Sequence, residues 1–146
     1  MSTFEYRKLL RANILLKVLY KTKNWPLLEG VAYSKNVGTV GINIIMGDKL
    51  EKNTELSLQI FLPGDDKPVM AAGKLVWQYK CPYLPPSSRQ YYTSGIQFSE
   101  MAPNDAIRAS DFIRNLLKTR SDAEVKKVID MIENIKHPKP PSGSGK

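Results

Sequence analysis

Cysteine and histidine are almost absent from this sequence. Its 146 residues include one cysteine, Cys81, and one histidine, His137. A lone cysteine cannot form a disulfide within the chain, and such sparse use of cysteine is typical of a reducing compartment. A lone histidine, followed by a proline, can complete neither a catalytic triad nor a histidine-based metal site. We therefore expect no catalytic residues, no metal site, no cofactor and no enzymatic activity.

Two weaker chemical candidates remain open at this point. Lys80 precedes Cys81, and a neighbouring ammonium group favours a thiolate, which would suit a redox role. Asp65 and Asp66 are adjacent carboxylates and could bind a metal ion. Because no base accompanies the cysteine, and because Pro-Gly-Asp-Asp is a common turn sequence, we expect neither role.

Long apolar runs are also lacking. No run approaches the roughly 20 residues that a membrane-spanning helix needs. The first residues carry Glu5, Arg7, Lys8 and Arg11, whereas a secretory signal has an unbroken apolar segment there. We expect a cytoplasmic protein with no membrane span.

Basic residues outnumber acidic ones by 22 to 14, which gives a net charge of +8. This excess favours an anionic partner. The first 24 residues include six basic side chains and a single acidic one, Glu5. The positive potential should therefore be concentrated near the N-terminus, where a phosphate-bearing ligand would be attracted.

Apolar segments separated by turn residues predict six β-strands. The clearest covers residues 54–62, in which leucine and isoleucine occupy every second position. The others are expected at residues 13–21, 27–35, 42–46, 69–79 and 91–99. Short strands at regular spacing are typical of an antiparallel barrel or sandwich, and a barrel leaves no open edge.

The pattern changes to a helical one after residue 103. An apolar stripe predicts a helix from Asn104 or Asp105 to about Thr119, packed across one mouth of the barrel. A capping box at residues 121–124 predicts a second helix over 121–136. Its stripe consists of Val125, Val128, Ile129, Ile132 and Ile135. This stripe requires a cover, which the sequence leaves open between the barrel, the first helix and a partner chain.

The domain organisation follows from these segments. Residues 1–12 form an arginine-bearing arm, residues 13–120 form the barrel with its helix, and residues 121–136 form the additional amphipathic helix. The remaining residues, 137–146, are rich in proline, serine and glycine, which predicts a disordered tail.

A polar hexapeptide, Asn36 to Gly41, separates two apolar runs and predicts an exposed turn between two strands. At Gly41 glycine would avoid the cost of about 1 to 2 kcal/mol that a side chain meets in a left-handed conformation, and would let a ligand approach the main chain. The carboxamide of Asn36 could brace the turn or bind a planar ligand edge. A hairpin turn without any binding role is the alternative.

Two arginines, Arg7 and Arg11, lie four residues apart just before the first predicted strand. On one helical turn or a tight bend both would project to the same side and could bind phosphates or the N7 and O6 edge of guanine. The alternative is a solvated basic arm. Because an apolar strand follows at once, the end of the arm is fixed to the fold, which favours a site.

Four motifs in order resemble the PilZ domain family over residues 5 to about 118. They are RxxxR (Arg7, Arg11), NxGxxG (Asn36, Gly38, Gly41), the strand Gly73-Lys74-Leu75-Val76-Trp77, and the strand Gly95-Ile96-Gln97-Phe98. One departure is Gly38, because the family most often has serine at this position. The missing hydroxyl bears on ligand affinity or preference.

The resemblance implies a six-stranded antiparallel barrel with C-terminal α-helices that binds cyclic di-GMP, a bacterial second messenger, or a related cyclic dinucleotide. It implies binding through Arg7, Arg11, Asn36, Gly38 and Gly41, with Lys8 and Trp77 as further candidates. As a signalling receptor the chain would also have a protein partner, in motility or biofilm regulation. A tryptophan on a barrel strand is usually core, which is where we expect Trp77, with stacking on a purine as the alternative.

Two other functions remain as alternatives. The chain could be a PilZ-like interaction module in motility or pilus assembly that has lost ligand binding, as the missing serine suggests. It could also be a general binder of single-stranded nucleic acid, which would show steep salt dependence and little preference for guanine. The intact arginine pair argues against the interaction module, and we expect no nucleic-acid partner.

Overall fold

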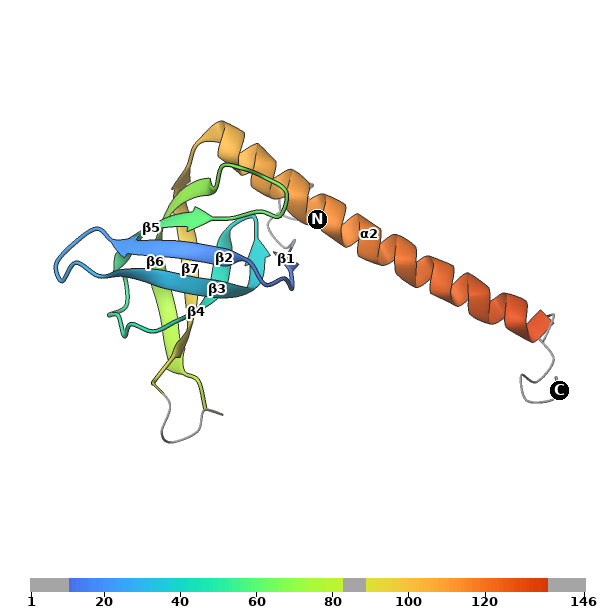
Figure 1. The fold of residues 1–146 in the computed structure, drawn as a ribbon, viewed down its shortest axis with the longest axis horizontal. Helices are drawn as coiled ribbons and strands as arrows, with labels where there is room; N and C mark the ends of the chain where they lie inside the picture. The colour runs from blue at the N-terminus through green and yellow to red at the C-terminus, as the bar shows by residue number, and fades with distance from the viewer. Residues whose placement is uncertain (1–10, 83–88, 137–146) are drawn as a thin grey trace. The chain divides into compact units, whose positions relative to one another are not determined.

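Six strands close into an antiparallel barrel in the computed structural model, which describes residues 11–82 and 89–136 (Figure 1). The pairing order is β3, β2, β5, β6, β7, β4, and β4 pairs back to β3. The predicted strands and the predicted barrel are therefore confirmed. The strands are β2 (Lys17–Thr22), β3 (Glu29–Gly38), β4 (Gly41–Met46), β5 (Glu55–Ile60), β6 (Val69–Lys80) and β7 (Tyr92–Met101).

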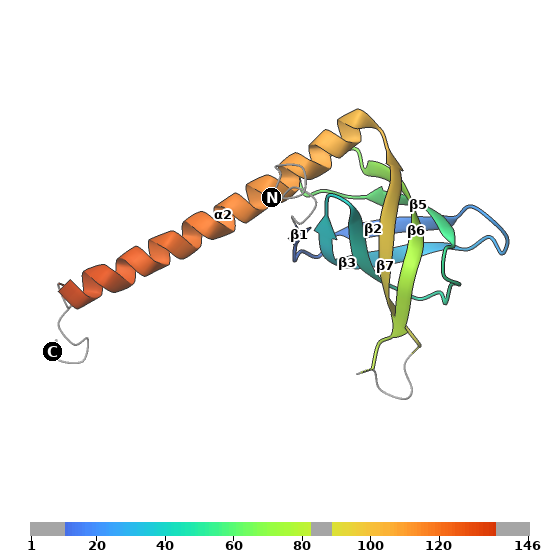
Figure 2. The same ribbon diagram turned by 180° about the vertical axis from the view of Figure 1, so that it is seen from behind.

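The core fills the barrel interior with aliphatic side chains from alternate strand positions. On β5, Leu56, Leu58 and Ile60 point inward and are buried, while the intervening polar side chains face outward. On β4, Ile42 and Ile44 are buried in the same way. Figure 2 shows β5, β6 and β7 from the other side of the barrel. This alternation leaves the outward positions of the strands available for a site.

A seventh strand, β1 (Arg11–Ala12), lies outside the barrel. It pairs antiparallel with the end of β3, with Arg11 opposite Gly38 and Ala12 opposite Val37. Ala12 is buried, whereas Arg11 faces outward. The last two residues of the predicted arm are thus attached to the barrel, while Arg7 and Lys8 lie outside the described residues.

The prediction of an exposed turn over the whole hexapeptide is wrong. β3 continues to Gly38 and β4 begins at Gly41, so only Thr39 and Val40 lie between them. Asn36 and Gly38 are strand residues, and Gly38 and Gly41 are buried. The strands extend this far because β1 supplies a second partner for the end of β3.

The expected left-handed conformation of Gly41 is also wrong. Among the described glycines, the one with a positive φ is Gly64, at 84°. Gly41 is instead required by the close approach of β7, because a Cβ built there would lie 2.5 Å from the carbonyl oxygen of Ile96. Real Cβ atoms do not approach an oxygen so closely.

One continuous helix, α2 (Pro103–Lys136), replaces the two helices predicted. The predicted break at Ser121 is wrong because no glycine or proline follows Pro103 within the helix, and serine or aspartate inside a helix costs only a few tenths of a kcal/mol. Residues up to Arg114 belong to the same compact unit as the barrel. There Ile113 is buried and shares a small apolar cavity with Val37 and Leu62, as expected for a helix that packs on the barrel.

The remaining helical residues, from Asn115 onward, belong to a second unit. Their side chains are exposed from Lys118 to Ile135. Within the residues that the structure describes, no helix combines the length and the apolar character that crossing a bilayer requires. The predicted tail, residues 137–146, lies outside this part of the chain.

Candidate ligand-binding site

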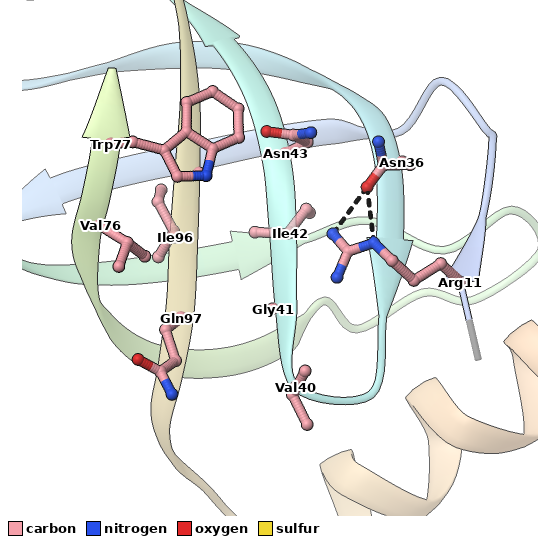
Figure 3. Close-up of a pocket in the computed structure, with 11 residues that line it drawn as sticks. Arg11, Asn36, Val40, Gly41, Ile42, Asn43, Val76, Trp77, Ile96 and Gln97 are labelled. Atoms are coloured by element: carbon pink, nitrogen blue, oxygen red, sulfur yellow. Dashed lines mark hydrogen bonds between the residues drawn. The ribbon is translucent and has the colours of Figure 1, made fainter. Parts of the chain in front are cut away.

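A pocket of about 360 Å³ lies on the outer face of the barrel, where β1, β3, β4, β7 and β6 lie side by side (Figure 3). This volume is within the usual range for small-molecule sites. Among the residues that the structure describes, its lining contains one cation, several amides and one indole, and no acidic side chain. The lining residues are Arg11, Asn36, Val40, Gly41, Ile42, Asn43, Val76, Trp77, Gly95, Ile96 and Gln97.

Four of these residues form one row across four strands. Asn36 on β3 is paired with Asn43 on β4, Asn43 is paired with Gly95 on β7, and Gly95 is paired with Trp77 on β6. Neighbouring strands lie about 4.8 Å apart, so the row spans about 14 Å. A polar end at Asn36 and an aromatic end at Trp77 thus face the same side of the sheet at a distance that suits a ligand larger than a single base.

Arg11 adds the charge at the polar end of this row. Its Nε and one of its Nη atoms donate hydrogen bonds to Oδ1 of Asn36, at 2.9 and 2.6 Å (Figure 3). Because two donors share one acceptor, the other Nη group of the guanidinium is left to point toward the pocket. Asn36 therefore positions the guanidinium and does not neutralise it.

No carboxylate of the described residues forms an ion pair with Arg11. Burial lowers the pKa of its guanidinium from the ordinary value, and the group is still protonated near neutral pH. A partly desolvated cation with only a neutral amide as partner attracts anions more strongly than a solvated one does. The polar end of the pocket is thus suited to a phosphate or to the acceptor edge of guanine.

Trp77 lies on the outer face of the barrel, and the predicted core position is wrong. Leu75 points inward and is 1% exposed, so in a regular strand Trp77 would point inward too. However, Leu75 pairs with Ile96 and Trp77 with Gly95, which makes Val76 an extra residue, a β-bulge. The bulge turns Trp77 outward, and the indole is half-buried in the pocket wall.

Gly95 seats the indole ring of Trp77. A Cβ at Gly95 would lie 2.3 Å from Cε2 and Nε1 of the indole, so no other residue fits under the ring in this position. Tyr79 stacks against the same indole, with 5.3 Å between the ring centroids and 30° between the planes. The ring is thereby held in place on the barrel surface and forms a rigid aromatic wall of the pocket.

Asn43 is a site residue that our sequence reasoning missed. It lies between Asn36 and Trp77 in the row, as Figure 3 shows, and its Oδ1 is buried. Within the described residues this oxygen accepts no hydrogen bond. The available signal was a lone polar residue in the otherwise apolar run Ile42-Asn43-Ile44-Ile45-Met46, at a position that alternation places on the outer face.

The predicted site residues fall into three groups. Arg11, Asn36, Gly41 and Trp77 line the pocket of about 360 Å³ on the outer face of the barrel. Gly38 instead lines a neighbouring pocket of about 210 Å³, together with residues of β7 and the start of α2. Arg7 and Lys8 lie outside the described residues.

The two weaker candidates lie elsewhere. The Cys81 thiol is 3.5 Å from the hydroxyl of Thr93. Asp65 accepts a hydrogen bond from Arg108 at 3.1 Å, and Arg108 also binds Asp105 at 2.9 Å. Asp65 therefore serves to connect a loop to the start of α2.

No family model matches the chain, and no curated protein matches it either. Several solved structures are similar to it. The Bacillus subtilis inhibitor of motility MotI/DgrA matches with a TM-score of 0.58 at 21% identity, over 76% of this chain and 51% of that one. MrkH of K. pneumonia matches with a TM-score of 0.58 at 12% identity, over 73% of this chain and 47% of that one.

A third solved structure is matched over nearly its whole length. The PilZ domain of YcgR from Escherichia coli, solved with c-di-GMP, matches with a TM-score of 0.56 at 11% identity, over 78% of this chain and 94% of that domain. By contrast, this chain spans about half the length of MotI/DgrA and of MrkH. With its closed six-stranded barrel, one outside strand and a C-terminal helix, this chain has a PilZ-like fold.

Proposed function

We propose that this chain is a receptor domain for cyclic di-GMP. The observation that carries the proposal is the Arg11 guanidinium, held by Asn36 and unpaired with any described carboxylate, at one end of a pocket whose other end is the seated indole of Trp77. A cyclic dinucleotide presents both phosphates and flat purines, which suit these two ends. The YcgR domain and MrkH have been solved with c-di-GMP, which supports the same ligand class for a chain of this fold.

Three lining residues, Arg11, Trp77 and Asn43, have definite roles in this proposal. Arg11 donates to a phosphate or to O6 and N7 of guanine through charge-assisted hydrogen bonds. Trp77 stacks on a purine ring. Oδ1 of Asn43 accepts from the N–H groups of the guanine edge, which relieves the cost of a buried acceptor without a partner.

The N-terminal arm supplies the signal. Arg7 precedes Arg11 by four residues, and we propose that bound ligand holds Arg7, with Lys8 beside it, against the barrel. The counter-charge of the phosphates allows two guanidinium groups to come together, which they otherwise resist. The resulting arrangement of the arm changes the surface that a protein partner meets, in a pathway such as motility or biofilm regulation.

Calorimetric titration tests the proposal. We expect cyclic di-GMP to bind far more tightly than its mixed guanine-adenine analogue or GTP. Its affinity should fall little between low and moderate salt. Steep salt dependence without guanine preference would instead support a general binder of single-stranded nucleic acid. Failure of every cyclic dinucleotide to bind would contradict the proposal.

One observation favours a second candidate function. Gly38 provides no hydroxyl and lies beside a pocket other than the one that contains Arg11. This would suit a PilZ-like interaction module in motility or pilus assembly that does not bind ligand. The same titration separates the two functions, because the module predicts no heat of binding for any nucleotide.

Replacing Asn43 with alanine should lower the affinity for cyclic di-GMP by about 1 to 2 kcal/mol, roughly 5- to 30-fold, because one base-edge hydrogen bond is lost. The ratio between the affinities for cyclic di-GMP and for the mixed guanine-adenine analogue should become smaller. In the absence of ligand, the free energy of unfolding should stay the same or rise, because the variant removes a buried acceptor without a partner. Calorimetry and urea denaturation measure the two effects.

Asn24→Ala is the matched control, since Asn24 is exposed and lines a different pocket. It should leave the affinity within about twofold. If Asn43→Ala destabilises the free protein and leaves binding unchanged, Asn43 has a structural role and does not contact the ligand.

A further inference from the structure

The second half of α2 carries an exposed apolar stripe that the proposed receptor function does not use. Val125, Val128, Ile129 and Ile132 are 56%, 53%, 51% and 45% exposed, and Ile135 is 81% exposed. Every residue from 118 to 135 is exposed. The sequence left open whether the barrel, the first predicted helix or a partner chain covers the stripe. Because α2 is continuous, no turn folds the stripe back onto the first half of the helix, so this half cannot be the cover.

The spacing of the stripe is that of a coiled-coil seam. Val125, Val128, Ile132 and Ile135 follow one another at intervals of three, four and three residues, which gives the 3.5-residue period of a and d positions. Ile129 lies at an e position and widens the seam. All five side chains are β-branched, so they lose little rotamer freedom when they pack against a second helix. Isoleucine at both a and d positions favours assemblies of more than two helices.

The charges of the segment also suit a second copy of itself. Residues 115–136 carry five basic and four acidic side chains, although the whole chain has a net charge of +8. Two such helices therefore repel each other little. Along one side of the helix, Asp122, Lys126 and Asp130 follow at four-residue intervals with alternating sign, so these charges are matched within one helix. Helices that lie on anionic membranes instead have a polar face dominated by lysine and arginine.

A helical segment such as residues 115–136 depends on the packing of its apolar face for much of its stability. We propose that residues 121–136 associate through the stripe with the same segment of a second copy of this chain, so that the protein is a dimer or a larger oligomer. The proposal is independent of ligand binding, because none of these residues lines the pocket on the barrel.

Light scattering on the full chain across a wide range of concentrations tests the proposal. The native chain should have at least twice the monomer mass of 16.5 kDa. Ile132→Lys should return the mass to that of the monomer, because a charge in the seam cannot be buried. Asn134→Lys adds the same side chain one half-turn away, on the polar face, and should keep the native mass.

Near-UV circular dichroism, to which the stacked pair of Trp77 and Tyr79 contributes, would verify that the barrel of each variant is folded. A native chain that is monomeric at all concentrations would overturn the proposal, and so would an Ile132→Lys variant that keeps the native mass. A monomer that co-sediments with anionic phospholipid vesicles would show that a membrane covers the stripe instead of a second copy.

Discussion

Arg11→Ala should weaken binding of cyclic di-GMP by about 3 kcal/mol, roughly 150-fold. The guanidinium is the one cation that the described residues contribute to the pocket lining, and it is partly desolvated beside Asn36, so a ligand anion would lose its charge-assisted partner. The affinity of Arg11→Lys should lie between those of the native chain and of Arg11→Ala, because an ammonium group keeps the charge but cannot make the bidentate contact. Calorimetric titration gives the three dissociation constants.

Lys21→Ala is the control for charge alone. Lys21 is exposed on β2, which contributes nothing to the pocket lining, and its removal should change the affinity by less than about twofold. The free energy of unfolding of Arg11→Ala should stay within about 1 kcal/mol of the native value, because the lost hydrogen bonds are exposed. Undiminished binding by a folded Arg11→Ala variant would place the ligand site elsewhere.

Gly41→Ala should destabilise the free protein by about 3 kcal/mol. The new Cβ would lie 2.5 Å from the carbonyl oxygen of Ile96, and this neighbour is backbone that cannot rotate away. β4 and β7 would have to separate at the point where Gly41 pairs with Gln97. Urea denaturation without ligand would show the loss as a lower transition midpoint.

Gly47→Ala is the matched control. Its nearest neighbour is the flexible end of the Arg89 side chain, at 3.3 Å, so it should cost less than about 1 kcal/mol. Equal stability of the two variants would mean that the strands are not in such close contact at Gly41. In that case glycine at this position would be explained by ligand approach alone.

The strands of this barrel could be predicted because their signal is local. Leu56, Leu58 and Ile60 alternate with polar residues, and the structure buries all three. Alternation on one strand reports its buried face without knowledge of any other strand. The meeting of Arg11 and Asn36, which are 25 residues apart, has no such local signal, and it was predicted only through motif spacing.

The position of Trp77 could not be predicted in this way. Its inward or outward direction depends on Val76, and nothing in the sequence marks Val76 as an extra residue. A bulge is defined by the register between two strands, here β6 and β7, and not by the residues of one. The same holds for Gly41, whose role depends on the distance to β7 and not on its own backbone conformation.

The predicted helix boundary at Ser121 was wrong for a different reason. The capping box at residues 121–124 has the correct residues for a helix start, but the same residues are tolerated within a helix when no glycine or proline stops the preceding one. A start signal alone therefore does not show that a new helix begins.

The row formed by Asn36, Asn43, Gly95 and Trp77 has a consequence for how such a protein can evolve. Each of these residues faces the pocket only because the number of residues before it in its strand places its side chain on the outer face of the barrel. A deletion or insertion of one codon within a strand would reverse inside and outside for the residues that follow, as Val76 already does for Trp77. A change in strand length should therefore damage the site more than the loss of one polar side chain, because it moves several lining residues at once.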